Sequence, residues 1–293
     1  MRPQQHLPVM AEETLAFLDV REDGVYVDAT VGPGGHSERI LEHLGREGAL
    51  YCLDRDEEAL ALARERLGDG RCRFRKARFG EMGQVLREEG LREADGVLMD
   101  LGVSMLQMKA PERGMSFASD APLDMRMDRS QALRAEDIVN SWSEKELADL
   151  IYTYGEETRS RRVARAIVQA RKHKRLTTCR ELTEVVSAVL PRRGRTHPAT
   201  RTFQALRMAV NDELGELERG LPQALALLKP GGRLAVIAYH SLEDRAVKNF
   251  MRREKEKGSL RVLTKKPVVA RREEVLSNPS ARSAKLRAAE AVR

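Results

Sequence analysis

The segment Val25–Ile40, VYVDATVGPGGHSERI, constrains the fold of this chain more than any other. It starts as a short apolar run of β-forming residues that ends at Asp28, and three glycines and a proline follow between Gly32 and Gly35. Glycine is needed where the backbone turns sharply or lies against a ligand, because a Cβ atom would clash there. A helical pattern begins directly after the glycines. Strand, glycine turn and helix in this order predict the first unit of a nucleotide-type cofactor site.

The same alternation continues through the first hundred residues. Helical patterns at Ser37–Leu44, Glu57–Arg66 and Met82–Glu89 separate four strand-like runs, which are Val25–Ala29, Ala49–Leu53, Cys72–Lys76 and Gly96–Met99. Strands that alternate with helices form a parallel sheet covered on both faces. The predicted fold class is therefore α/β, with a Rossmann-like doubly wound sheet.

A long insertion interrupts this alternation. The next convincing strand is Leu234–Tyr239, more than a hundred residues after Met99, whereas a crossover needs roughly a dozen residues. Capping boxes at Ser143–Glu146 and Thr178–Glu181 mark helices within the insertion. We predict a discontinuous catalytic domain over residues 1–107 and 206–293, and a helical substrate-recognition domain over residues 108–205.

The segments outside this alternation are predicted to be an irregular loop, a basic helix and two β-like runs. An irregular loop rich in Pro, Gly, Asp and Met covers Gln107–Asp128, between the fourth strand and the helices. A basic helix at Glu243–Lys257 follows the fifth strand. Two further β-like runs, Leu260–Ala270 and Ala284–Ala291, would form a closing antiparallel pair at the edge of the sheet.

The charge of the chain is unevenly distributed. The net charge is +7, but residues 159–207 alone carry +12 and residues 245–293 carry +10, so the rest of the chain is acidic. Two basic segments on an acidic body favour a phosphate-rich partner such as RNA. The alternative is that arginines simply solvate helix faces, as they do in heat-adapted proteins.

Cysteine, histidine and apolar content exclude several classes of protein. The three cysteines, Cys52, Cys72 and Cys179, are widely spaced and form no CxxC motif, which predicts a reducing compartment without a disulfide framework. Six scattered histidines without HxH or HxxxH spacing predict no metal site. No apolar run approaches the ~20 residues of a membrane span, and no signal-peptide core is present. We therefore expect a cytoplasmic protein with no membrane association.

The glycine turn does not match a dinucleotide site. The fingerprint G-x-G-x-x-G/A would place its third glycine at Ser37, while an acidic residue that can bind ribose hydroxyls is present as Asp54. A nucleoside cofactor without a diphosphate fits better, and S-adenosylmethionine is such a cofactor. Its cationic sulfonium and amino groups suit the acidic residues that end strands, which are Asp28, Asp54 and Asp100. Asp28 alone would equally serve to fix the glycine turn.

Longer motifs resemble a known family. They occur in family order along nearly the whole chain and are HLPVM, DATVGPGGHS, LDRD, DLGVS, ERGMSF, PLDMRM, YGEE, HPATRTFQALRMAVNDEL, YHSLEDR and NPSARSAKLR. Together they resemble the MraW family of bacterial methyltransferases. The resemblance implies a class I S-adenosylmethionine-dependent enzyme with an inserted helical domain, which methylates the N4 amine of a cytosine in small-subunit (16S) rRNA.

The resemblance also implies a set of cofactor residues. Gly34, Gly35 and His36 would lie at the methionine end of the cofactor, Asp54 on the ribose and Phe79 near the adenine. Asp100 and Gln107 would complete the pocket around the sulfonium and amino groups. From the residues alone, Phe79 reads as a core residue and His36 as a solvent-facing residue at a helix start.

The reaction needs a group that orients the amine and accepts its proton, because the amine lone pair is delocalised into the ring. Many amino-methyltransferases use an Asp/Asn-Pro-Pro-aromatic turn after the fourth strand, but the turn here is Asp100–Ser104, without proline or an aromatic residue. The candidates are Asp100 first, then His240, and then Asn211. Structural hydrogen bonding is the alternative role for each.

A base is reached for chemistry only when it is unpaired or flipped. Candidate substrate-binding residues, which could stack on a base or contact phosphates, are Arg113, Phe117, Arg126, Trp142, Arg162 and Arg165. Core packing is the alternative for Trp142. The expected partner is small-subunit rRNA or the small ribosomal subunit, and the sequence leaves a homodimer open.

Three other functions remain in competition. One is a cytosine-N4 methyltransferase acting on DNA, which the missing Pro-Pro-aromatic turn disfavours. Another is a non-enzymatic ribosome-assembly or RNA-binding factor with a vestigial cofactor pocket, which the intact Gly34–Gly35 turn, Asp54 and Asp100 disfavour. A nicotinamide-dependent dehydrogenase is disfavoured by Ser37.

Overall fold

A computed structural model describes residues 8–117, 120–192 and 197–292 of the chain. The first two residues of the HLPVM motif and residues 118–119 of the loop that follows ERGMSF lie outside the described residues. The chain divides into two compact units, one formed by 1–102 with 214–293 and the other by 103–213. The predicted helical segment 108–205 falls inside the second unit.

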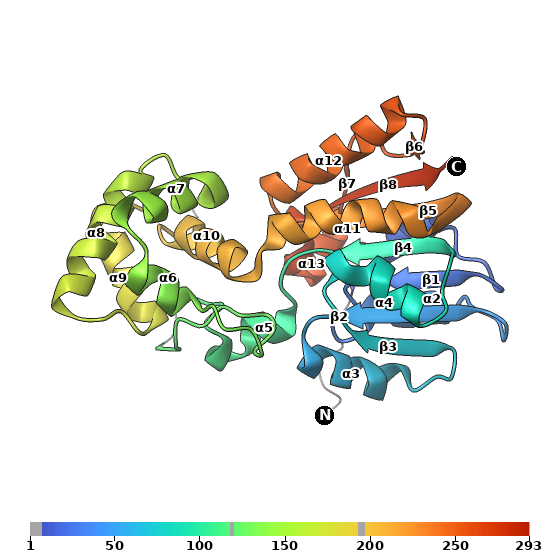
Figure 1. The fold of residues 1–293 in the computed structure, drawn as a ribbon, viewed down its shortest axis with the longest axis horizontal. Helices are drawn as coiled ribbons and strands as arrows, with labels where there is room; N and C mark the ends of the chain where they lie inside the picture. The colour runs from blue at the N-terminus through green and yellow to red at the C-terminus, as the bar shows by residue number, and fades with distance from the viewer. Residues whose placement is uncertain (1–7, 118–119, 193–196, 293) are drawn as a thin grey trace. The chain divides into compact units, whose positions relative to one another are not determined.

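The first unit is built around one sheet with the strand order β3-β2-β1-β4-β5-β8-β6, and β7 pairs with β8 (Figure 1). Its strands are β1 (Val25–Asp28), β2 (Ala49–Asp54), β3 (Cys72–Lys76), β4 (Ala94–Asp100), β5 (Leu228–Ala238), β6 (Leu260–Val262), β7 (Val268–Val269) and β8 (Lys285–Ala291). The first five strands are parallel, and β8 runs antiparallel to β5, β6 and β7.

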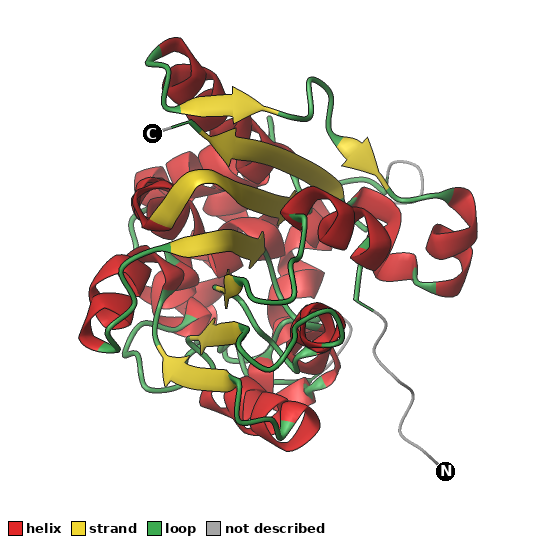
Figure 2. Ribbon diagram, turned by 90° about the vertical axis from the view of Figure 1, so that its right-hand side faces the viewer, coloured by secondary structure: helices red, strands yellow, loops and turns green. Residues whose placement is uncertain are grey.

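Helices flank the strands on both sides (Figure 2). The α-helices of this unit are α1 (Ala11–Leu18), α2 (Gly35–Leu41), α3 (Glu57–Leu67), α4 (Met82–Glu88), α11 (Glu213–Leu227, whose first residue is assigned to the other unit), α12 (Ser241–Glu256) and α13 (Arg272–Ser277). Short 3-10 turns lie at Phe79–Glu81 and Pro279–Ser283.

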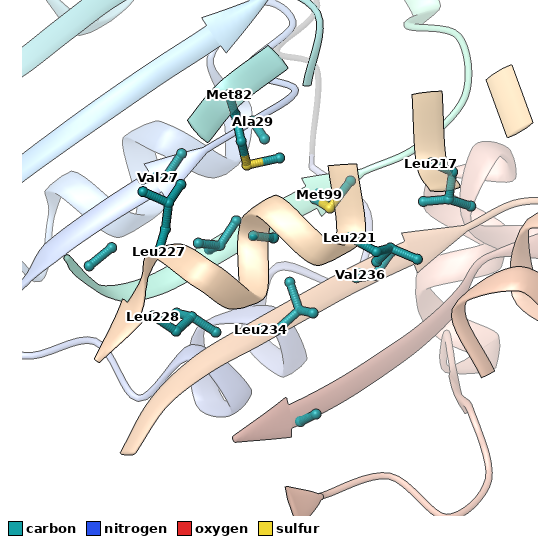
Figure 3. Close-up of a cluster of buried hydrophobic side chains, with 14 of the residues drawn as sticks. Val27, Ala29, Met82, Met99, Leu217, Leu221, Leu227, Leu228, Leu234 and Val236 are labelled. Atoms are coloured by element: carbon teal, nitrogen blue, oxygen red, sulfur yellow. The ribbon is translucent and has the colours of Figure 1, made fainter. Parts of the chain in front are cut away.

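Alternate residues of each strand face opposite helical layers, as the period of two in a strand requires. Val27 and Met99 pack with Met82 of α4 and Leu221 of α11 in one cluster, part of which Figure 3 shows. Their neighbour Leu98 packs instead in a second cluster, with residues of α1, α2 and α3. Because both of their faces are buried, the central strands β1, β2 and β4 are largely apolar, and this is why they stand out in the sequence.

The second unit is helical. It contains α5 (Met105–Lys109), a 3-10 turn (Pro111–Arg113), α6 (Ala135–Ser141), α7 (Glu144–Gly155), α8 (Ser160–His173), α9 (Cys179–Val189) and α10 (Thr200–Asn211). Its own apolar core includes Leu147 and Ile151 of α7, Ile167 of α8, Val186 of α9 and Leu206 of α10. A unit with a separate core of this kind satisfies the usual definition of a domain.

The sequence patterns predicted most of these elements. The capping boxes are confirmed, because Ser143 Oγ accepts the Glu146 N–H at 3.2 Å and Thr178 Oγ1 accepts the Glu181 N–H at 3.3 Å. The predicted run Leu260–Ala270 is wrong as a single strand, since it contains two short strands on either side of a turn. Among the described residues, no helix has the length and apolarity to cross a membrane.

Candidate active site

Three aspartates terminate three neighbouring strands of the sheet. Asp28, Asp54 and Asp100 are the last residues of β1, β2 and β4. These strands are parallel neighbours, so their carboxyl ends lie along the same edge of the sheet. Doubly wound sheets bind ligands in the crevice at this edge, where the strand order reverses.

The glycine turn between β1 and α2 is held by Asp28. Its Oδ2 accepts the Ser37 hydroxyl at 2.7 Å and its Oδ1 accepts the Thr30 N–H at 3.2 Å, and the residue is only 1% exposed. Gly34 has φ +88°, a backbone conformation that residues with a Cβ rarely adopt. Asp28 therefore has the turn-fixing role that the sequence offered as its alternative, and Ser37 is its partner.

Asp54 supports the same turn from the neighbouring strand. Its Oδ2 accepts the Gly32 N–H at 2.8 Å and its Oδ1 accepts the Asp56 N–H at 2.9 Å. A carboxylate has about four lone-pair sites, so both oxygens retain the capacity to accept a hydroxyl of a ribose. Burial raises the pKa of Asp54 to about 6, and the two backbone N–H groups limit that rise.

Asp100 lies in a network that spans four segments of the chain. Its backbone N–H donates to Thr30 Oγ1 at 2.7 Å, which links the ends of β4 and β1. The Tyr239 hydroxyl donates to Asp100 Oδ1 at 2.8 Å from the end of β5. On the other oxygen, Oδ2, the His36 Nε2 atom approaches to 3.5 Å. The carboxylate is thus approached at both oxygens by side chains of other elements.

His36 and Tyr239 both hold their protons more firmly in this environment. Burial lowers the pKa of His36, but the carboxylate of Asp100, supported by Asp28 and Glu274, outweighs burial, and the net pKa lies above the usual value. For Tyr239, burial and the negative Asp100 raise the pKa well above its usual value, so its hydroxyl stays a hydrogen-bond donor. His36 is 7% exposed and does not face solvent, in contrast to the alternative drawn from the sequence.

Sequence reasoning missed Tyr239. It identified the neighbouring His240 instead, because histidine is the usual acid or base and a tyrosine after a buried strand reads as packing. The available signal was its position: a polar-tipped residue directly after β5 falls on the same sheet edge as the aspartates.

His240 is engaged locally, in the first turn of α12. Its Nδ1 accepts the Glu243 N–H at 3.4 Å and its Nε2 lies 3.2 Å from Glu243 Oε1. Glu243 Oε2 also accepts the Tyr239 N–H at 2.9 Å. These contacts make His240 the N-cap of α12, a structural role in which Glu243 approaches both ring nitrogens.

Phe79 begins the short turn after β3 and is partly buried. Its ring lies against α11, since a Cβ on Gly220 would come within 2.6 Å of Phe79 Cδ2. The contact matches the core-packing alternative for this residue, and its adenine role stays a prediction.

The remaining candidates belong to the second unit, and several of them are structural there. Asn211 is 1% exposed, its Oδ1 accepts the Met127 N–H at 2.8 Å, and its Nδ2 donates to the Met125 carbonyl at 2.8 Å and to the Arg207 carbonyl at 2.9 Å. It therefore anchors the loop before α6 to the end of α10. Gln107 Oε1 accepts the Ser104 N–H at 3.1 Å in the capping box of α5.

Two arginines expected to contact phosphates are buried instead. Arg113 is 1% exposed and donates to the Met127 carbonyl at 2.9 Å. Arg126 is 8% exposed, and its Nε and Nη2 pair with the two oxygens of Asp124 at 2.7 and 2.8 Å. The predicted loop Gln107–Asp128 is not irregular throughout, since it contains the end of α5 and the 3-10 turn Pro111–Arg113. Both guanidinium groups donate to the segment between this turn and α6, whose described residues form no helix or strand that would satisfy their carbonyls.

The aromatic candidates also have neighbours within the second unit. Phe117 stacks on His197 with ring centroids 4.5 Å apart. Trp142 is half-buried and lines a hollow of about 390 Å³ with Tyr154 and the acidic residues Glu146, Asp149 and Asp212. Carboxylates around this hollow would repel a phosphate backbone.

Arg162 and Arg165 do lie at the surface, on α8. Arg165 Nε is 3.4 Å from Glu144 Oε1, an exposed pair that contributes little to stability. Arg162 forms no ion pair within the part of the chain that the structure describes. These two side chains remain available to a polyanion.

The strand order separates this sheet from that of a dinucleotide-binding dehydrogenase, which continues 3-2-1-4-5-6 in parallel. Here β8 enters beside β5 in the opposite direction. Asp54 and Asp100 at the sheet edge suit a nucleoside that carries positive charge. The protein is a class I S-adenosylmethionine-dependent methyltransferase, with a helical insertion after the fourth strand.

Comparison with known proteins gives the family. The model described as the MraW methylase family matches residues 3–292. A Geobacter sulfurreducens protein named ribosomal RNA small subunit methyltransferase H is 50% identical, with 97% of this chain and 98% of that protein covered. The protein of that name from Paramagnetospirillum magneticum is 48% identical, with 99% and 96% covered. The chain belongs to the MraW methylase family.

Among solved structures, an rRNA methylase from Streptococcus thermophilus is similar at 13% identity and a TM-score of 0.46, with 97% of this chain and 95% of that chain covered.

Proposed function

We propose that this protein transfers a methyl group from S-adenosylmethionine to the N4 exocyclic amine of a specific cytidine in small-subunit (16S) rRNA. The observation that carries the proposal is identity of 48–50% along almost the whole chain to proteins named ribosomal RNA small subunit methyltransferase H. Identity of this extent covers the helical unit, which we propose recognises the substrate, as well as the sheet.

The residues at the sheet edge fit the methyl donor. When bound, S-adenosylmethionine supplies a methyl group made electrophilic by a positively charged sulfur. Asp54 would accept the ribose hydroxyls, and Asp100 would face the cationic groups. Gly34, Gly35 and His36 form the turn at the methionine end, and the family resemblance adds Phe79 and Gln107. Two carboxyl groups at this edge with lone pairs to spare support this assignment.

Asp100 is the residue proposed to orient the amine. The amine nitrogen must attack the methyl carbon in line with the breaking carbon–sulfur bond, and the nitrogen must lose one proton as the new bond forms. A carboxylate that accepts an amine N–H draws electron density toward the nitrogen and directs its lone pair. The Tyr239 hydroxyl and the Thr30 contact hold the Asp100 segment in place for this role.

The helical unit is proposed to bind the RNA through α8. Arg161, Arg162 and Lys172 are exposed on this helix, and they have no ion-pair partner among the described residues. Arginine and lysine side chains that contact phosphates release bound counterions, which provides much of the affinity for nucleic acids.

Methylation of isolated small subunits tests the proposal. Subunits that lack the modification are incubated with the protein and methyl-labelled S-adenosylmethionine, and the rRNA nucleosides are separated by mass spectrometry. We expect label in N4-methylcytidine, and a loss of at least about 100-fold in rate for Asp100→Asn, because removing one positioned polar group typically costs 10² or more. Asp23→Asn, in an exposed loop, is the matched control and should retain full rate.

The outcomes separate the competing functions. Binding of small subunits without any methyl transfer would favour the assembly factor with a vestigial pocket. Label in a different nucleoside or at another atom of cytidine would contradict the N4 assignment. Methylation of DNA but not of rRNA would support the DNA-directed alternative.

A further inference from the structure

The two oxygens of the Asp100 carboxylate face chemically different side chains, a neutral hydroxyl and a titratable imidazole. On Oδ1 it accepts the Tyr239 hydroxyl at 2.8 Å, a neutral donor that keeps its proton. On Oδ2 it faces the Nε2 atom of His36 at 3.5 Å, a group that can carry or lose a positive charge. Only the second partner can therefore adjust the net charge at this carboxylate.

His36 is enclosed by acidic groups from three other elements. Asp100 of β4, Asp28 of β1 and Glu274 of α13 all favour its protonated form, and Tyr239 at the end of β5 completes the surroundings of Asp100. The Nε2 atom is buried, and it makes no hydrogen bond within regular geometry among the described residues. A histidine in this setting serves as a counter-charge for Asp100.

We propose that His36 carries a proton in the ligand-free enzyme and releases it when a cationic ligand binds against Asp100, so that the site senses the charge on the cofactor sulfur. The inference rests on the proposed function, since it takes Asp100 to be the residue that faces the sulfonium.

The physical reason is charge balance at one carboxylate. An imidazolium and a sulfonium on the same carboxylate repel each other, and burial of His36 weakens the screening between them. S-adenosylmethionine and its product, S-adenosylhomocysteine, share all their other groups and differ in one methyl group and one positive charge. Protonated His36 therefore weakens the binding of S-adenosylmethionine and leaves the binding of S-adenosylhomocysteine unaffected by this repulsion.

The reaction itself can restore the proton. As the carbon–nitrogen bond forms, the carbon–sulfur bond breaks, and its electron pair stays on sulfur and cancels the positive charge. The amine nitrogen loses one proton in the same event. The loss of charge on sulfur lets His36 bind a proton again, and the amine releases one proton in the same step. The proton balance therefore needs no further reactant.

Calorimetry on the full-length protein tests this proton coupling. Binding of S-adenosylmethionine and of S-adenosylhomocysteine is measured between pH 5.5 and 8.5, in pairs of buffers with different ionisation enthalpies. We expect the substrate to release more protons than the product, by up to one. At pH values where His36 is protonated in the free enzyme, the affinity for S-adenosylmethionine divided by that for S-adenosylhomocysteine should fall as the pH is lowered. The expected fall is about tenfold for each pH unit, which is the limit for one linked proton.

Variants separate the charge role of His36 from a structural one. His36→Asn should make the affinity ratio independent of pH. His43→Asn, an exposed histidine close to α2, should behave as the wild type. Tyr239→Phe should weaken both ligands by a similar several-fold factor and leave the pH dependence of their ratio intact, because this tyrosine positions Asp100 without titrating.

Nuclear magnetic resonance of histidine labelled with ¹⁵N gives a second measurement on the unmodified chain. The His36 Nε2 signal should shift to the neutral form with S-adenosylmethionine and not with S-adenosylhomocysteine. Equal proton release for both ligands, or an unchanged His36 signal, would overturn the inference while the proposed function stands. Failure of both ligands to bind at every pH would instead overturn the proposed function, and this inference with it.

Discussion

At the scale of single residues, the site is defined by the partners and the exposure of each polar group. Asp28 and Asp54 each accept one hydrogen bond on each carboxylate oxygen, but Asp28 is only 1% exposed, whereas Asp54 and Asp100 are partly exposed. Both ring nitrogens of His240 are approached by Glu243. Residue type alone would rank all four residues as candidates, and burial together with hydrogen-bond partners separates them.

Asp54 provides a prediction about pH. Its pKa is about 6 in the folded protein and its ordinary value is 3.8, so the folded state holds the proton more tightly than the unfolded chain. The contribution of Asp54 to stability is therefore largest below pH 4 and is lost as the pH rises through about 6. The loss amounts to at most about 3 kcal/mol, from 1.36 kcal/mol per pKa unit.

Urea unfolding of the wild type and of Asp54→Asn between pH 3.5 and 7.5 checks this direction. The free energy of unfolding of the wild type, relative to the variant, should decrease as the pH rises across this window. A relative stability that increases with pH would contradict the assignment of a raised pKa.

Asn211 provides a second prediction at the same scale. Asn211→Ala removes three hydrogen bonds and leaves the Met127 N–H and the Met125 carbonyl without this partner. Because a buried, unsatisfied polar group costs about 1–3 kcal/mol, we expect a loss of about 2–4 kcal/mol in unfolding free energy. Chemical denaturation measures it, with the exposed Asn249→Ala on α12 as the control, expected within about 0.5 kcal/mol of the wild type. A change equally small for Asn211→Ala would exclude the anchoring role.

At the scale of elements, the helix starts predicted from the sequence agree with the observed ones where the sequence contains a capping box. Helices α7 and α9 start at the predicted capping boxes, since a Ser or Thr side chain satisfies a backbone N–H that the helix itself cannot. The start of α12 is also capped, but by His240, a residue type that local rules do not associate with this position.

The cap of α9 is testable by a single substitution. Thr178→Ala removes the acceptor for the Glu181 N–H and should lower the free energy of unfolding by about 1 kcal/mol. Thr178→Ser keeps the hydroxyl and is expected to stay within a few tenths of a kcal/mol of the wild type. Thermal or urea unfolding followed by circular dichroism distinguishes them, and equal losses for both variants would show that the methyl group, and not the cap, matters.

At the scale of the whole molecule, each of the two units has its own hydrophobic core and its own set of functional charged side chains. Each of the two units has its own apolar clusters, and the sheet edge with its aspartates belongs to one unit while α8 with its exposed arginines belongs to the other. This arrangement is consistent with one unit for the methyl donor and another for a polyanionic substrate.

Binding of small subunits should accordingly depend on salt through α8. The double variant Arg161→Gln/Arg162→Gln is expected to weaken binding at low salt. It should also reduce the slope of log affinity against log salt by about 1 for each phosphate that the variant no longer neutralises. The control is Arg64→Gln on α3, which is paired with Glu57 at 3.0 Å. A slope that is unchanged in the double variant would remove α8 from the proposed RNA surface.

The sequence by itself determined the elements that depend on near neighbours along the chain. The five parallel strands, the glycine turn, the long insertion and the capped helices all follow from periodicity, from glycine and from capping, which act within a few residues. The placement of Asp28, Asp54 and Asp100 at strand ends could be predicted for the same reason.

Only the tertiary structure decided which polar side chains are free to act. Arg113 and Arg126 are buried in their loop, and Asn211 and His240 are engaged by backbone groups far or near in sequence. Tyr239 meets Asp100 across 139 positions of the chain. Burial and hydrogen-bond partners arise from segments that come together only on folding, and no local pattern encodes them.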